Sequence, residues 1–88
     1  MHVCWTGRVQ GVGFRYTAES AALDLKLVGW VRNLPDGRVE AIVEGSEKAL
    51  KSFLEQIGSG PMKPYIRQTT VDWNPVTREF EDFRIRFY

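Results

Sequence analysis

The segment GRVQGVGFR, residues 7–15, leads out of a predicted strand, through a loop with two closely spaced glycines, and into a predicted helix. Gly11 and Gly13 allow the backbone to turn sharply and to expose its N–H groups. The start of the helix adds unpaired N–H donors and the positive end of the helix dipole. Arg15, in the first turn, adds a planar charged group that suits two phosphate oxygens. The segment therefore predicts a site for a phosphoryl group or a carboxylate.

A tight turn followed by a solvated arginine is the structural alternative, and these residues taken alone favour it. Nucleotide-binding motifs do not fit the segment. No Gly-Lys-Ser/Thr follows the loop, and a dinucleotide fingerprint would need a glycine at position 16, where Tyr16 stands. If the segment does bind an anion, it belongs to another class of site.

Length and composition limit the function classes. The chain has 88 residues, of which 43% are hydrophobic, so we expect residues 1–88 to form a single domain with a packed core. A net charge of +1 argues against a strongly basic nucleic-acid surface, though not against a local basic patch, and we expect no nucleic-acid partner. The single cysteine, Cys4, allows no internal disulfide, and no apolar run approaches the ~20 residues of a membrane span. The N-terminal residues do not have the pattern of a secretion signal, so we expect a cytoplasmic protein with no membrane partner. We also expect a monomer.

The hydrophobic pattern predicts seven elements. Alternation predicts strands, and apolar residues at helical spacing predict helices, at 2–9 (strand), 14–27 (helix), 28–33 and 38–44 (strands), 47–57 (helix), 66–73 and 83–88 (strands). Two helices are too few to cover both faces of such a sheet. We therefore expect an α+β fold of order β-α-β-β-α-β-β, a two-layer ferredoxin-like sandwich with both helices on one face of a mainly antiparallel sheet.

The predicted topology places two distant segments together. A helical crossover between the first two strands makes them parallel, so both strands end at the same edge of the sheet. We therefore expect the loop of residues 10–15 to lie near Asn33, at the end of the second strand. Without further information, Asn33 is best interpreted as a residue that starts the turn before Leu34 and Pro35.

Two segments resemble a known family. They are GRVQGVGFR at 7–15, and GWVRN at 29–33 followed by Asp36 and Gly37. In order and spacing they resemble the acylphosphatase family, and the resemblance covers essentially the whole chain. It implies the sandwich fold described above. It also implies hydrolysis of a carboxyl-phosphate anhydride to a carboxylate and inorganic phosphate, with no metal and no cofactor.

The resemblance assigns roles residue by residue. Arg15 matches the family's phosphate-binding arginine, and Asn33 matches the asparagine that orients the attacking water. The phosphate-binding loop corresponds to the backbone N–H groups of Gln10, Gly11, Val12, Gly13, Phe14 and Arg15. The partners implied are a small acyl phosphate as substrate and inorganic phosphate as product.

Such a reaction needs few catalytic groups. A carboxylic acid has a pKa of ~4, so the carboxylate departs without being protonated and a general acid is dispensable. The remaining tasks are to neutralise phosphoryl oxygens and to aim a water molecule. The first suits Arg15 and oriented amides. The second suits the Asn33 carboxamide, which has both donor and acceptor atoms.

The other titratable residues are weaker candidates for a catalytic or metal-binding role. His2 is predicted to be a solvated or edge residue, and Cys4 a packing residue rather than a nucleophile. The acidic residues are scattered and suggest no metal-ligand cluster.

Two other functions remain open. An RNA-binding module of the same fold is disfavoured, because the third strand, residues 38–44, carries two acidic residues and no aromatic one. A non-catalytic phosphate-sensing or interaction module would retain the same loop, and the sequence does not separate it from an enzyme.

Overall fold

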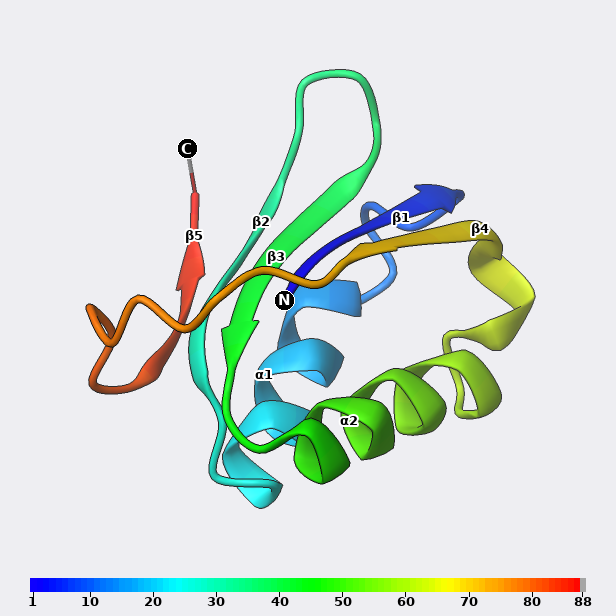
Figure 1. The fold of residues 1–88 in the computed structure, drawn as a ribbon. Helices are drawn as coiled ribbons and strands as arrows, with labels where there is room; N and C mark the ends of the chain where they lie inside the picture. Colours follow the sequence, from blue (N-terminus) through cyan, green and yellow to red (C-terminus); the bar gives the residue numbers. More distant parts are fainter. Residues whose placement is uncertain (88) are drawn as a thin grey trace.

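The computed structural model describes residues 1–87, which form a five-stranded sheet with two helices packed on one face (Figure 1). The strands are β1 (His2–Gly7), β2 (Val28–Asn33), β3 (Val39–Glu44), β4 (Ile66–Asp72) and β5 (Phe83–Arg86). The helices are α1 (Phe14–Asp24) and α2 (Glu47–Ser59), and a short 3₁₀ helix, Lys63–Tyr65, precedes β4. The predicted ferredoxin-like fold class is confirmed. Within residues 1–87, no helix has the length and apolar character needed to cross a membrane.

The strand order β4-β1-β3-β2-β5 brings the ends of β1 and β2 together. Both strands are antiparallel to β3, which lies between them, so they run parallel to each other. Val39, at the start of β3, pairs with Trp5 on one side and with Asn33 on the other. Since neighbouring strands lie ~4.8 Å apart, Trp5 and Asn33 are separated by about 10 Å. Of the two outer pairs, β1 with β4 is antiparallel and β2 with β5 is parallel.

The core lies between the sheet and the two helices. Trp5 is 1% exposed, and its ring centroid lies 4.9 Å from that of Phe14 and 6.2 Å from that of Phe53. These contacts fix the first turn of α1 and the middle of α2 against β1. Burial of aromatic side chains of this size contributes a few kcal/mol each to stability. Because Phe14 is held in the core, the position of the adjacent Arg15 is set by the fold.

β1 is shorter than predicted, because Gly7 ends it where strand pairing had been expected to reach Val9. Gly7 has a φ of 138°, and a Cβ at this position would overlap the backbone carbonyl of Tyr65. The register of β1 with β4 also shifts between Thr6 and Gly7. The chain therefore leaves the sheet two residues early.

α1 is also shorter than predicted, ending at Asp24 instead of Leu27. Lys26 takes a left-handed conformation with a φ of 57°, while the N–H groups of Leu25 and Leu27 bond back to the last turn of the helix. Smaller differences affect four other elements, of which β3 begins at Val39 instead of residue 38. α2 extends to Ser59, β4 stops at Asp72, and β5 stops at Arg86, while Tyr88, predicted as its last residue, lies outside the described residues.

The segment between β4 and β5 crosses the sheet (Figure 1) and is held by a buried carboxylate. Glu44, at the end of β3, is 5% exposed and accepts hydrogen bonds from the Thr77 N–H and hydroxyl and from the Arg78 N–H, at 2.9, 2.9 and 3.2 Å. Burial raises the pKa of Glu44, but these hydrogen bonds lower it more, so its pKa lies below the ordinary value. Thr77 and Arg78 therefore attach this otherwise mostly exposed segment to the end of β3.

Candidate active site

The loop between β1 and α1 depends on two glycines in the left-handed conformation. Gly11 has a φ of 77° and Gly13 a φ of 80°, which other residues adopt at a cost of roughly 1–2 kcal/mol. A Cβ at either position would meet no atom within 4 Å. Glycine is therefore required here for the backbone conformation rather than for space, as the sequence predicted.

This loop presents a series of unpaired backbone donors. Within residues 1–87, the N–H groups of residues 10–16 donate to no protein acceptor, and the first bond of α1 runs from the Thr17 N–H to the Gly13 carbonyl at 3.0 Å. α1 has no side-chain N-cap and no acidic residue in its first turn. Unpaired N–H groups at the positive end of a helix dipole are the features that bind anions.

Gln10 anchors the loop to the turn between β2 and β3. Its side-chain amide donates to the carbonyls of Leu34, at 2.7 Å, and Arg38, at 3.0 Å. Leu34 directly follows Asn33, and its own N–H donates to the Arg38 carbonyl at 2.8 Å, which closes the hairpin. The loop and the end of β2 are therefore neighbours, as the topology predicted. The role of the Gln10 side chain was not predicted, because no local sequence pattern identifies acceptors 24 and 28 residues away.

Arg15 is half-buried, and its guanidinium lies over an aromatic ring from the other end of the chain. The guanidinium carbon is 4.9 Å from the ring centroid of Phe87. Phe87 follows Arg86, which pairs with Arg32 in the parallel register of β5 and β2. Phe87 thus continues β5 alongside Asn33, the residue after Arg32. Sequence reasoning missed Phe87, although its alternation with the buried Phe83 indicated that it faces the helices.

Asn33 faces the same side of the sheet. It lies two residues after the fully buried Val31, so alternation directs both side chains toward the helix layer. Its carboxamide forms no hydrogen bond with any other residue in the range 1–87, which leaves its donors and acceptors available. The loop, Arg15 and Asn33 consequently lie at one end of the sheet, on its helix-covered side.

The predicted edge position of His2 is wrong. It lies on an inner strand, β1, between β3 and β4, and its Nε2 is 2.8 Å from a carboxylate oxygen of Glu40. Its position on the face opposite to the helices separates it from the loop, so it is not a candidate acid or base for the same site.

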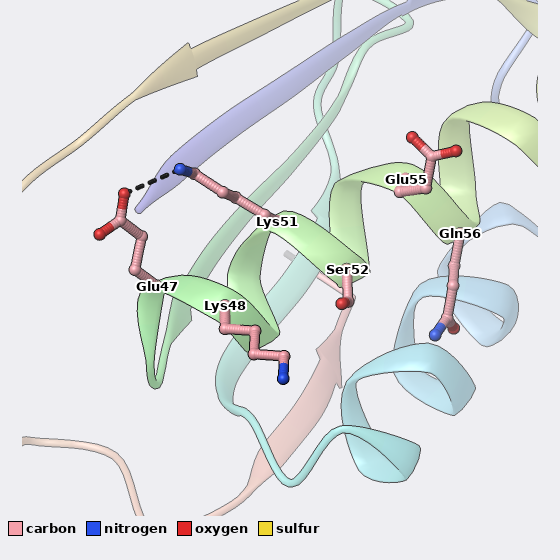
Figure 2. Close-up of a pocket in the computed structure, with 6 residues that line it drawn as sticks. All are labelled: Glu47, Lys48, Lys51, Ser52, Glu55 and Gln56. Carbon is pink, nitrogen blue, oxygen red and sulfur yellow. Dashed lines mark ion pairs between the residues drawn. The ribbon is translucent and has the colours of Figure 1, made fainter.

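A hollow on the outer surface of α2 does not combine the features of an anion-binding site (Figure 2). Its lining comes from one helix: Glu47, Lys48, Lys51, Ser52, Glu55 and Gln56. Lys51 and Glu47 form an exposed ion pair of 3.0 Å at i,i+4 spacing, which stabilises a helix by only about 0.3–0.5 kcal/mol. We interpret this hollow as the solvated face of α2.

Known proteins match the chain along nearly its full length. The acylphosphatase family model matches residues 1–85. An acylphosphatase of Marinobacter nauticus is 45% identical over 83 residues, which is 94% of this chain and 90% of the relative. The chain belongs to the acylphosphatase family.

Two further acylphosphatases agree with this assignment. The acylphosphatase of Geobacillus kaustophilus is 42% identical over 87 residues, covering 99% of this chain and 93% of its own length. The crystal structure of the Bacillus subtilis acylphosphatase superposes with a TM-score of 0.89 at 40% identity, covering 97% of this chain and 94% of that one. The resemblance found in the sequence is therefore confirmed at the level of family and fold.

Proposed function

We propose that this chain hydrolyses the carboxyl-phosphate bond of acyl phosphates, giving a carboxylate and inorganic phosphate. In this proposal the N–H groups of residues 10–15 and the Arg15 guanidinium bind the phosphoryl group, and Asn33 orients the attacking water. The observation that carries the proposal is the meeting of unpaired N–H groups, Arg15 and an unbonded carboxamide at one end of the sheet.

The leaving group explains why these groups are sufficient. Water oxygen attacks phosphorus, and the bond from phosphorus to the acyl oxygen breaks with its electron pair on the carboxylate. A carboxylate is stable at neutral pH because its acid has a pKa of ~4, so no acid has to protonate it. What remains for the protein is to balance charge on the phosphoryl oxygens and to align the water in line.

Arg15 is held in a manner that suits a dianion. The guanidinium carbon lies 4.9 Å from the Phe87 ring centroid, within range of a cation–π attraction, and the planar group can still donate its N–H groups to two phosphoryl oxygens. The ring also restricts the motion of a long side chain, so less conformational entropy is lost when substrate binds.

Asn33 positions water without acting as a base. A carboxamide oxygen accepts a hydrogen bond from the water, but it is too weakly basic to remove a proton before attack. We propose that the proton goes to a phosphoryl oxygen of the substrate. The reaction then needs no titratable side chain and no metal ion.

Further properties belong to the same proposal. Few side chains around the loop are able to select an acyl group, so we expect broad acceptance of small acyl phosphates. We also expect the protein to act as a monomer in the cytoplasm and not to bind nucleic acid.

The decisive experiment follows benzoyl phosphate by the loss of its ultraviolet absorbance, with and without EDTA and with no added metal. We expect hydrolysis at the same rate in both samples. Binding of inorganic phosphate with no turnover would instead identify a phosphate-sensing module. Hydrolysis abolished by EDTA and restored by a metal would overturn the mechanism.

A further inference from the structure

Three side chains with metal-binding atoms meet on the face of the sheet that the helices leave uncovered. His2 and Cys4 are two residues apart on β1, so both point to this face. Glu40 on β3 is the register partner of Cys4 and points to the same face. One nitrogen, sulfur or oxygen atom from each of the three residues lies within 4.8 Å of the others. Sequence reasoning found no such cluster, because it is created by strand pairing across more than 30 residues.

The distances approach those of a tetrahedral metal site. His2 Nε2 lies 2.8 Å from Glu40 Oε2, and Cys4 Sγ lies 4.0 Å from the same nitrogen. With Zn–S of about 2.3 Å and Zn–N and Zn–O of about 2.0 Å, a tetrahedral ion separates S from N by about 3.5 Å and N from O by about 3.3 Å. Each of these two separations therefore needs to change by about half an ångström, while the sulfur-to-oxygen separation, at most 4.8 Å, has to shorten to about 3.5 Å.

We propose that His2 Nε2, Cys4 Sγ and Glu40 Oε2 bind one Zn²⁺ ion per chain, with water as the fourth ligand. Imidazole, thiolate and carboxylate together are the donors that Zn²⁺ prefers, whereas Mg²⁺ and Ca²⁺ prefer oxygen alone. The Cys4 thiol gives its proton to solvent as the Zn–S bond forms. Thiolate and carboxylate then balance the two charges of the ion.

Surrounding residues already orient two of the ligands. Arg32 Nε lies 2.8 Å from Glu40 Oε1, which holds the carboxylate with its other oxygen toward His2. Asp72 Oδ2 lies 3.7 Å from His2 Nδ1, close enough to accept a hydrogen bond from that nitrogen after a small movement. A carboxylate behind a metal-binding histidine selects the tautomer that leaves Nε2 free for the metal.

The site is shielded but can be reached. Cys4 is 7% exposed, while the side chains of His2 and Glu40 are 29% and 16% exposed. It lies on the opposite face of the sheet from α1, and the proposed hydrolysis uses none of its residues. A failure of the zinc proposal would therefore leave the proposed hydrolysis unaffected, and the reverse also holds.

Cobalt(II) is the probe for this proposal, because it replaces zinc in such sites and reports its ligands by absorption. We expect the reduced protein to bind one equivalent of Co²⁺, with a thiolate-to-cobalt charge-transfer band and the visible bands of tetrahedral Co²⁺. One equivalent of Zn²⁺ should bleach both signals. In Cys4→Ser the charge-transfer band should disappear, and in His2→Gln and Glu40→Gln the affinity should fall on the order of 100-fold.

Two controls keep the test independent of folding. Thr70→Ser alters the β4 residue that pairs with Cys4 and removes no ligand, so its Co²⁺ spectrum should match that of the unmodified protein. Each variant is compared by circular dichroism and thermal unfolding without metal. If the folded protein shows no charge-transfer band, or if Cys4→Ser binds Co²⁺ equally well, the proposal is wrong. Binding of half an equivalent, with dimer formation, would overturn a site built from one chain.

Discussion

The two helices of this protein begin in opposite ways. α2 begins after Ser46, whose backbone is extended and whose hydroxyl accepts a hydrogen bond from the Ala49 N–H at 3.1 Å. Glu47 then places a negative charge near the positive end of the helix dipole. α1 begins after Gly13, with a φ of 80° and no side-chain cap, and its first turn carries Arg15. A cation at this end of a helix opposes the dipole.

The contrast between the two helix starts indicates that one contributes mainly to stability and the other mainly to binding. At the start of α2, the Ser46 hydroxyl accepts one of the first N–H groups and the Glu47 carboxylate compensates the helix dipole, so this end attracts a bound anion less. The start of α1 is left unsatisfied, at a cost to stability that a bound anion can offset. Changes at the start of α1 should therefore mainly alter activity, whereas changes at the start of α2 should mainly alter stability.

The largest expected effect is from Arg15→Ala. Removing the only charged group in the first turn of α1 should lower kcat/KM for benzoyl phosphate by about 10³-fold or more, because this charge faces the phosphoryl oxygens in the transition state. The free energy of unfolding should change by less than about 1 kcal/mol, since the cation opposed the dipole and only its stacking on Phe87 is lost. Arg84→Ala, an exposed arginine on the other face, is the matched control. Equal activity of the two variants would contradict the proposed site.

Asn33→Ala should have the next largest effect. We expect kcat to fall by about 10²-fold, while the inhibition constant of inorganic phosphate changes by less than about threefold, because phosphate does not need an oriented water. Steady-state kinetics with phosphate as inhibitor measures both quantities, and Asn74→Ala serves as the control for loss of an exposed carboxamide. Equal losses in turnover and in phosphate binding would mean that Asn33 binds the phosphoryl group.

Inorganic phosphate should stabilise the unmodified protein. At a concentration about 100 times its dissociation constant, phosphate adds ~2.7 kcal/mol to the free energy of unfolding and raises the midpoint of thermal unfolding by several degrees. The shift should be lost in Arg15→Ala and retained in a variant of the other helix, Ser46→Ala. A shift of the same size in Arg15→Ala would place the phosphate elsewhere.

Ser46→Ala should have the smallest effect, and only on stability. Loss of the hydroxyl that caps α2 should cost about 1 kcal/mol, measured by urea unfolding, with kcat/KM unchanged. Ser59→Ala, at the other end of the same helix, is a matched control because its hydroxyl bonds the Glu55 carbonyl and caps no N–H group. A large loss of activity in Ser46→Ala would show that the two helix starts are coupled.

Much of the fold could be predicted because its signals are local. Alternation and helical spacing depend on residues within one element, and Pro35, Asp36 and Gly37 mark the turn between β2 and β3. Knowledge of strand direction then placed Asn33 near the loop, since a crossover helix makes two strands parallel whatever their neighbours are.

Particular side-chain contacts between distant segments could not be predicted. The bonds from Gln10 to the hairpin and the stacking of Arg15 on Phe87 depend on which strands are neighbours, and alternation gives no strand order. The position of His2 on an inner strand depends on the same order. Element ends were also missed where a conformation such as that of Lys26 carries no local signal.

The carboxylate of Glu44 has a consequence for behaviour in acid. Because its pKa is lower in the folded protein than in the unfolded chain, its contribution is complete at neutral pH and is lost as the pH falls through the folded value. Protonation removes the charge that Thr77 and Arg78 hold, so residues 74–80 should detach from the sheet while the helix layer stays packed. Acid should therefore make this stretch the first point of cleavage by an acid-tolerant protease, and Glu44→Gln should be cleaved there already at neutral pH.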